Sequence, residues 1–319
     1  MPLNENSNQS KFGIIPYGGL GNQLFQFATV LSLTTIHENR FHFDLIGKTN
    51  NNPNGLPEIF KLGNISEVEI RQRGNLAKAI GSKLSKVSIT LSSISTDSVI
   101  KLLARRILNA IIRRLFYVFL KASISYPTGV GYDPKFSEIV GTNSTIIGNF
   151  HSYRWISAES KRCIIEHFRK TKFSETVLQF RERAKITKPI AIHIRLGDYE
   201  LIDELNVVSK EYFDSALDRL TKSRTNQEVW IFTNDQEKST QFLSAAFQEK
   251  AIWIPDTLNS LETLEVMRHC HAFVISNSTY SWWGAFLADD VKAEVIAPKI
   301  WIKNHPEPLE ICPPHWQRI

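Results

Sequence analysis

The chain has 319 residues, of which 42% are hydrophobic and 22% are charged. These proportions are typical of a globular protein with enough apolar side chains for two packed cores, and they exclude a chain that is disordered throughout. The formal net charge of +6 indicates anionic partners without choosing among them.

The positive charge is concentrated in one segment. Residues 70–132 contain eleven Lys or Arg side chains and a single acid, Asp97, so the rest of the chain is net negative. Apolar residues from Val99 to Val118 recur at helical spacing, which predicts one or two amphipathic basic helices. Two interpretations remain open: the segment contacts an anionic membrane surface, or it is a solvated helical face. We expect no nucleic-acid partner, because no known DNA- or RNA-binding motif occurs.

The chain offers few groups for metals or disulfides. Its three cysteines are far apart and include no CxxC pair, which favours a reducing compartment. No Asp-x-Asp pair occurs, so we expect neither a metal nor another cofactor. The first eleven residues are polar, and no stretch approaches the roughly 20 apolar residues of a membrane-spanning helix. We therefore expect a cytoplasmic protein, peripheral at the inner membrane surface if the basic segment docks there.

The first half begins with the pattern of an α/β domain. A short apolar run at 12–16 predicts a buried strand, a glycine turn follows it, and residues 23–37 predict a helix. Further strands are predicted at 41–45 and 145–150, and a helix at 158–169.

The second half alternates strands and helices more regularly. The predicted strands are 189–195, 229–233, 251–254, 272–276 and 294–297, and the predicted helices are 210–221, 236–248, 261–268 and 281–288. This alternation predicts a parallel, doubly wound sheet. Ligands bind such sheets at the carboxyl ends of the strands, which is where the polar motifs of this sequence fall.

The first motif is GGLGNQ at 18–23, between a predicted strand and a predicted helix. Glycines let a ligand approach the backbone closely, and a helix start offers unpaired N–H groups to an anion. Gly19, Gly21, Asn22 and Gln23 are therefore candidate substrate contacts. A tight connection, with Asn22 as the helix cap, explains the same residues about equally well.

The second motif is HIRLGDY at 193–199, at the end of a predicted strand. Strands alternate their faces, so His193 and Arg195 point to the same side. The forked guanidinium of Arg195 suits a diphosphate, although an ion pair with Asp198 that stabilises the turn is the alternative. His193, Asp198 and Glu200 are the candidates for a general base, if one is needed.

The third motif is FTND at 232–235, again at a strand end. Asn234 and Asp235 have the groups that recognise a nucleobase edge. A simple N-cap at Asp235 for the following helix is the stronger interpretation of this motif alone.

The fourth motif, SNSTYSWWGA at 276–285, lies between a buried strand and a helix. Its hydroxyls and the first amides of the helix suit a phosphate, while at least one of the paired tryptophans is expected in the core. The candidate contacts are Ser276, Asn277, Ser278, Thr279, Ser281 and Trp282.

Together these motifs resemble those of glycosyltransferase family 11, the α-1,2-fucosyltransferases of bacterial type. GGLGNQLFQFA, HIRLGDY, FTND and SNSTYSWWGAFL occur in the family's order. GNFHSYRWI at 148–156 is similar to the aromatic segment that precedes the family's donor domain. The family's motif H-x-R-R-G-D-Y has a second arginine where this chain has Leu196, which points away from Arg195, so we expect the main phosphate contact to survive.

The resemblance implies an α/β fold of GT-B-like type, with two Rossmann-like domains facing a cleft. We expect an acceptor-side domain at 1–175 with a basic helical insertion at about 70–125, and a GDP-fucose-binding domain at 176–319.

The resemblance also implies the reaction: an inverting, metal-independent transfer of L-fucose from GDP-fucose to the 2-hydroxyl of a terminal galactoside, in glycan or O-antigen synthesis. In that scheme Arg195 holds the β-phosphate, Asp235 contacts guanine, and residues 276–281 complete the diphosphate site. The alternative is an inactive or different-donor protein that binds a nucleotide sugar.

Overall fold

The computed structural model divides the chain into two compact units. The first unit consists of Met1–Phe60 and Asn64–His167, and the second of Lys61–Gly63 and Phe168–Ile319. The domain bounds expected from the sequence stay a prediction, and much of the expected basic insertion at about 70–125 lies outside the described residues. The described residues are 11–37, 40–45, 58–63, 69–72, 83, 87, 100, 103–104, 107–108, 110–112, 114–115, 123–125, 131–136, 144–199, 202–205, 207–222, 224, 227–288, 293–303 and 310–319.

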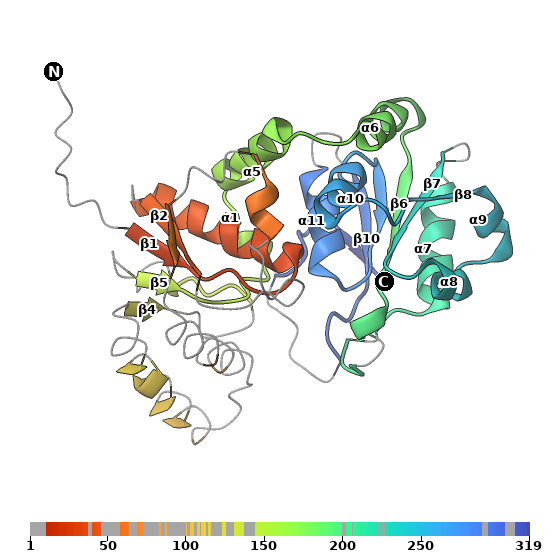
Figure 1. Cartoon of the computed structure of the whole chain (residues 1–319). Helices are drawn as coiled ribbons and strands as arrows, with labels where there is room; N and C mark the ends of the chain where they lie inside the picture. The colour runs from red at the N-terminus through yellow and green to blue at the C-terminus, as the bar shows by residue number, and fades with distance from the viewer. Residues whose placement is uncertain are drawn as a thin grey trace. The chain divides into compact units, whose positions relative to one another are not determined.

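The first unit is built on a parallel sheet with the strand order β3-β2-β1-β5-β4 (Figure 1). The chain extends the sheet from β1 to one side, through β2 and β3, and later returns to the other side of β1 with β4 and β5. The strand order therefore reverses between β1 and β5, a place where open parallel sheets bind ligands. The strands are β1 (Lys11–Ile14), β2 (Arg40–Leu45), β3 (Glu69–Gln72), β4 (Ser123–Ser125) and β5 (Ser144–Ile146).

Helix α1 (Leu20–His37) covers this sheet by packing against β1 and β2. Its apolar side chains Leu24, Phe25 and Phe27 are buried, as expected for a helix pressed onto a sheet. The hydroxyls of Thr29 and Ser32 donate to carbonyl oxygens four residues earlier, which lets polar side chains share this buried helix. Among the other helical elements whose bounds the structure describes, η1 (Glu58–Lys61), η3 (Tyr153–Trp155) and α5 (Ala158–Lys170) lie wholly or mostly in this unit.

The second unit is built on a parallel sheet with the strand order β11-β10-β9-β6-β7-β8 (Figure 1). Its central strands β6, β7 and β9 are buried and mostly apolar, as is typical when helices cover both faces of a parallel sheet. The strand order reverses between β6 and β9. The strands are β6 (Ile190–Ile194), β7 (Val229–Thr233), β8 (Ala251–Trp253), β9 (Ala272–Val274), β10 (Glu294–Ala297) and β11 (Gln317–Arg318).

Right-handed crossovers place the helices of the second unit on opposite faces of its sheet. Helix α7 follows β6 on one face, whereas α10 and α11, which contact each other, precede and follow β9 on the other. The helical elements are α6 (Glu175–Thr187), η4 (Gly197–Tyr199), α7 (Lys210–Lys222), α8 (Gln236–Ser239), η5 (Thr240–Phe242), α9 (Ala245–Lys250), α10 (Ser260–Met267) and α11 (Thr279–Leu287).

The structure corrects one expected helix and adds one that was not predicted. The helix predicted at 236–248 is three short pieces, because Leu243 and Ser244 adopt extended backbone angles while Leu243 is buried in the core. The amide of Gln248 donates to two carbonyl oxygens beside the break, those of Thr240 and Leu243. Helix α6 was not predicted, since only Val177 and Ala184 are buried along it and its sequence has no apolar stripe.

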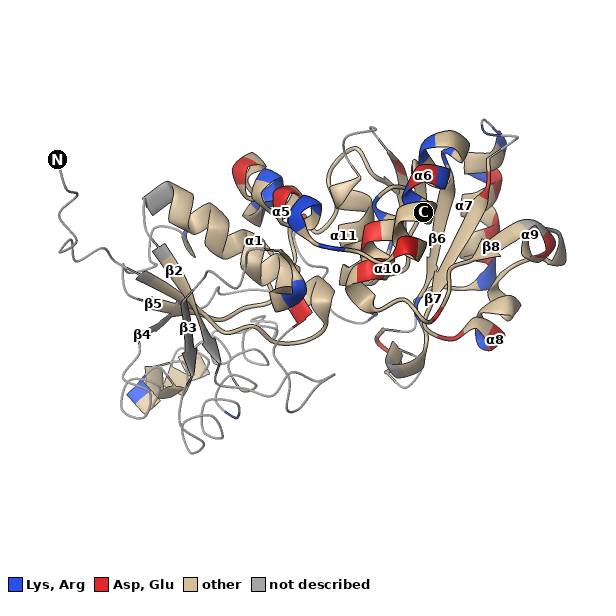
Figure 2. Ribbon diagram, turned by 45° about the horizontal axis from the view of Figure 1, so that its top comes forward, with Lys and Arg blue, Asp and Glu red and all other residues tan. Residues whose placement is uncertain are grey.

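The surface helices carry charges of both signs. Lys and Arg side chains lie among Asp and Glu side chains on α5 and α6 (Figure 2). Within the part of the chain that the structure describes, every helix is too short or too polar to cross a membrane.

The packing of α11 on α10 depends on a glycine. A Cβ atom added to Gly284 would lie 2.3 Å from Met267 Sδ and 2.8 Å from its Cγ. Met267 is itself fully buried, so the side chain has little room to move away.

We predict that Gly284→Ala destabilises the chain by about 1–3 kcal/mol, although alanine is intrinsically the better helix residue by about 1 kcal/mol. Thermal unfolding measures the change. In a Met267→Ala background the same substitution should cost nothing, because the added methyl group fills the vacated space. A higher melting temperature for Gly284→Ala in the wild-type background would contradict this packing.

Candidate functional site

In the second unit, polar side chains meet where the strand order reverses. His193 belongs to β6, and Ser276 comes two residues after β9 ends. Their side chains are buried, and His193 Nδ1 lies 2.9 Å from Ser276 Oγ. The ring of Tyr280, at the start of α11, lies 5.7 Å from the imidazole between centroids. The HIRLGDY and SNSTYSWWGA motifs of the sequence are thus joined at one strand edge by contacts within this unit.

Arg195 and Leu196 follow β6 and point to different surroundings. The guanidinium of Arg195, which is half-buried, lies 5.3 Å from the centroid of the Tyr199 ring. Leu196 is buried in the hydrophobic core with Val208 and Phe213. An arginine at this position would either bury its charge in that core or turn its side chain out of it. Leucine therefore fits the observed packing better than arginine does. Asp198 lies in η4, and its side chain is outside what the structure describes.

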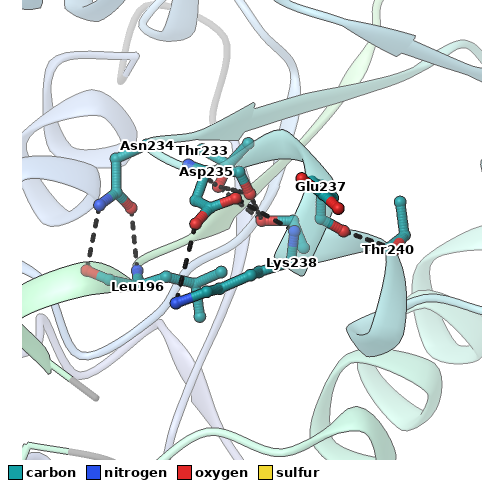
Figure 3. Close-up of polar contacts among 8 residues, drawn as sticks. Leu196, Thr233, Asn234, Asp235, Glu237, Lys238 and Thr240 are labelled. Carbon is teal, nitrogen blue, oxygen red and sulfur yellow. Dashed lines mark hydrogen bonds and ion pairs between the residues drawn. The ribbon is translucent and has the colours of Figure 1, made fainter. Parts of the chain in front are cut away.

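Asn234 binds the backbone of Leu196, the residue after Arg195, and Figure 3 shows the Asn234–Leu196 pair. Its Oδ1 accepts from the Leu196 N–H at 2.9 Å, and its Nδ2 donates to the Leu196 carbonyl at 3.1 Å. Gly197 continues the turn with φ +75°, and a Cβ there would lie 3.0 Å from Asn234 Nδ2. The amide and the glycine are therefore fitted to each other, and the expected role of Asn234 in substrate binding stays a prediction.

Asp235 caps α8, as the stronger sequence interpretation expected. Its carboxylate accepts from the Lys238 N–H at 3.1 Å, and its own N–H donates to Thr233 Oγ1 (Figure 3). Ser239 completes this group by donating to the Asp235 carbonyl at 2.6 Å. Contact between Asp235 and a guanine base stays a prediction.

The residues around the start of α11 are mostly turned inward. Ser276, Ser281 and Trp282 are fully buried, and the Trp282 indole N–H donates to the Ile311 carbonyl at 2.9 Å. The Ser278 hydroxyl caps α11 by accepting from the Tyr280 N–H, and Asn277 Nδ2 donates to two carbonyl oxygens, those of Leu205 and Trp301. Thr279 is half-buried at the first position of α11. Ligand contact by this group stays a prediction.

In the first unit, the glycine turn leads from β1 into α1. Gly18 has φ +75°, a conformation that favours glycine. Gly19 has no such requirement, and a Cβ there would meet nothing within 4 Å, so the backbone beside it is open. Gln23 is buried, donates to the Gly18 carbonyl and accepts from the Ile59 N–H, which ties the turn to η1. Gly21 is also buried, and ligand contact by these residues stays a prediction.

His151 lies beside Asn22 where the strand order of the first unit reverses. Its Nε2 is 3.1 Å from Asn22 Oδ1, and because an amide oxygen only accepts, the imidazole Nε2–H is the donor. Phe150, which is buried and has φ +55°, makes the turn that delivers His151 to this position. A positive φ is uncommon for a bulky residue and often marks a functional site.

Both histidines are neutral near pH 7. Burial, with the Arg195 charge as a second cause, lowers the pKa of His193 to about 3. Burial lowers the pKa of His151 to about 4. The imidazole of His193 therefore adds no second positive charge near Arg195 at this pH.

His151 is the site residue that the sequence motifs did not single out. The segment around it attracted notice for its aromatic residues, and Phe150 and Trp155 do pack together with a ring centroid distance of 5.4 Å. The signal that locates His151 is its place a few residues after β5, next to the reversal of strand order. In the described part of the chain, no three His, Cys, Asp or Glu side chains are grouped to hold a metal, and metal independence stays a prediction.

We predict that Asn234→Ala lowers the free energy of unfolding by about 1–2 kcal/mol, because both backbone groups of Leu196 lose their partner. Asn234→Asp keeps the acceptor for the Leu196 N–H but places a carboxylate oxygen next to the Leu196 carbonyl oxygen. It should therefore restore little of the lost free energy of unfolding. Chemical denaturation measures both, with Gln236→Ala, an exposed amide two residues away, as the matched control. Equal stability of Asn234→Ala and the control would contradict a stabilising role for the two Asn234–Leu196 hydrogen bonds, which we call the Asn234 clamp.

One known protein resembles this chain along nearly its whole length, and another resembles about a third of it. The α-1,2-colitosyltransferase of Escherichia coli is 23% identical over 315 residues, covering 95% of this chain and 96% of that protein. The O-antigen biosynthesis glycosyltransferase WbnK of Escherichia coli is 25% identical over 119 residues, covering 36% and 39%.

Among solved structures, the fucosyltransferase NodZ from Bradyrhizobium superposes with a TM-score of 0.50 at 12% identity, covering 88% of this chain and 94% of NodZ. With the two parallel sheets, this likeness confirms the expected α/β fold class of GT-B-like type.

The family assignment follows from the region that contains most of these motifs. The sequence model of "Glycosyl transferase family 11" matches residues 136–316, which is more than half of the chain. The match includes His193, Arg195, Asn234 and the whole 276–285 motif at the strand edge of the second unit. The chain belongs to glycosyltransferase family 11.

Proposed function

We propose that this glycosyltransferase moves L-fucose from GDP-fucose to the 2-hydroxyl of a terminal galactoside, with inversion and without a metal, in glycan or O-antigen synthesis. The observation that carries the proposal is the strand edge where Arg195, the His193–Ser276 pair and the start of α11 come together in the second unit. The name of the colitosyltransferase relative supports the α-1,2 linkage, and that of WbnK supports O-antigen synthesis.

Arg195 has the chemistry needed to stabilise the departing GDP. Its guanidinium is always charged and can donate two parallel hydrogen bonds to phosphate oxygens. The Asn234 clamp on Leu196 fixes the backbone that carries Arg195, so little reorganisation is required when negative charge develops. The start of α11, at the same strand edge, adds the partial positive charge of a helix N-terminus.

His193 suits a neutral role better than that of a base. A general base works best when its pKa lies near the operating pH, and a pKa of about 3 makes this imidazole a weak proton acceptor. We propose that His193 orients Ser276 and helps to bind the substrate, and that Asp198 remains the candidate to accept the proton of the acceptor hydroxyl or to orient Arg195.

A second donor deserves a direct comparison because of the colitosyltransferase relative, which is similar along 95% of this chain. Colitose is L-fucose without the 3-hydroxyl group. The two donors therefore differ in one hydrogen-bonding group, which an active site that pairs with that hydroxyl distinguishes strongly.

We predict transfer from GDP-fucose to a β-galactoside, a product with an α-1,2 linkage, and undiminished rates in EDTA. The assay pairs GDP-fucose and GDP-colitose with galactose-terminated acceptors, and nuclear magnetic resonance identifies the linkage. If the enzyme clearly preferred GDP-colitose, the proposed donor would be GDP-colitose and not GDP-fucose. Loss of activity in EDTA that manganese restores would contradict the metal-free mechanism.

We predict that Arg195→Ala lowers kcat/KM by about 100-fold or more, since the charge on departing GDP loses its main counter-charge. Arg195→Lys should have an intermediate kcat/KM, because lysine keeps the charge but cannot donate two parallel hydrogen bonds. Arg183→Ala is the matched control, since Arg183 forms an exposed ion pair with Glu228 in the same unit. Wild-type rates in a folded Arg195→Ala variant would refute the assignment.

We predict that His151→Phe lowers transfer about tenfold or more, because the Asn22 amide loses the donor that orients it. His151→Gln can present an N–H near the same place and should retain most activity. Because the pKa of His151 is about 4, the pH profiles of the wild type and His151→Gln should coincide between pH 5 and 8. Equal activity of the Phe and Gln variants would contradict a role for this hydrogen bond.

A further inference from the structure

An exposed apolar strip lies in the basic segment of the first unit. Ile100 is 81% exposed, and Leu103, Ile107 and Ile111 are each at least 50% exposed. The described residues between 100 and 115 are helical, and these four recur three or four positions apart, so they share one face of a helix. Ile112, on another face, is buried, which indicates which side of the helix packs against protein.

This arrangement separates the two interpretations of the basic segment. A helix that is merely solvated turns its apolar stripe to the core and its polar side chains to water. Here large aliphatic side chains face outward together with Arg114, which lies three positions after Ile111 and is also exposed. Contiguous exposed apolar side chains of this kind mark a contact surface.

The charge around the strip indicates its partner. Between residues 99 and 132 the sequence has six Lys or Arg residues and no Asp or Glu. The surface helix α5, by contrast, mixes both signs (Figure 2). An apolar face in a stretch of sequence whose charges are all positive complements an anionic lipid bilayer, which has negatively charged headgroups above apolar acyl chains.

We propose that the segment 100–115 lies along the surface of an anionic membrane, in contact through its described helical residues. Ile100, Leu103, Ile107 and Ile111 enter the boundary between headgroups and acyl chains, while lysines and arginines of the segment remain near the lipid phosphates. This attachment does not depend on which sugar the enzyme transfers, so its test reads out binding and not catalysis.

The test is flotation of the full chain with vesicles of phosphatidylglycerol and phosphatidylcholine, compared with phosphatidylcholine alone. We expect binding to the anionic vesicles that weakens in high salt. The variant Leu103→Ser/Ile107→Ser/Ile111→Ser should lower the partition coefficient about tenfold or more. Ile186→Ser is the matched control, because Ile186 is 82% exposed on α6 in the second unit, and it should bind as the wild type does.

A second variant keeps the test decisive if the triple variant fails to fold. Arg113→Glu/Arg114→Glu retains the apolar strip and should lose most of its preference for anionic vesicles. The proposal is overturned if the wild type binds neither vesicle, if it binds both equally, or if the charge-reversed variant binds like the wild type. It is also overturned if light scattering shows a dimer that the triple serine variant abolishes, since the strip then faces a second copy.

Discussion

The position of the candidate site follows from one property of parallel sheets, which bind ligands at the carboxyl ends of their strands. Where the order of such a sheet reverses, the connections leave in opposite directions and the strand ends stay uncovered by the chain's own loops. Each unit has one such place, between β1 and β5 and between β6 and β9. Each has a polar pair there: Asn22 with His151 in the first unit, and His193 with Ser276 in the second.

In the candidate site of the second unit, the neutral state of His193 limits the positive charge beside Arg195. Burial and the nearby guanidinium hold the pKa of His193 far below its ordinary value, so the imidazole does not add a second positive charge beside Arg195. The side chain of Leu196, the next residue, is buried in the core. The Asn234 amide binds the N–H and the carbonyl of Leu196. Arg195 is therefore a cation on a turn whose backbone is held in place, which suits recognition of a diphosphate.

Much of the second unit could be predicted from its sequence. Its strands are short apolar runs with helices between them, and this pattern alone indicates a parallel sheet with its polar motifs on one edge. The broken helix at 236–248 could not be predicted, because the burial of Leu243 decides it. Helix α6 escaped prediction because few of its residues are buried and no periodic apolar stripe marks it.

The sequence by itself determined the order of the motifs, the family they resemble and the choice of Arg195 as the central charge, because these depend on residue types and on spacing along the chain. Only the tertiary structure decided which motif residues face each other. Asn234 contacts a backbone 38 residues away, His151 meets Asn22 across 129 residues, and Trp282 and Gln23 are buried among the chain's own groups. Such contacts depend on how strands align across a sheet, and local sequence patterns carry no record of that alignment.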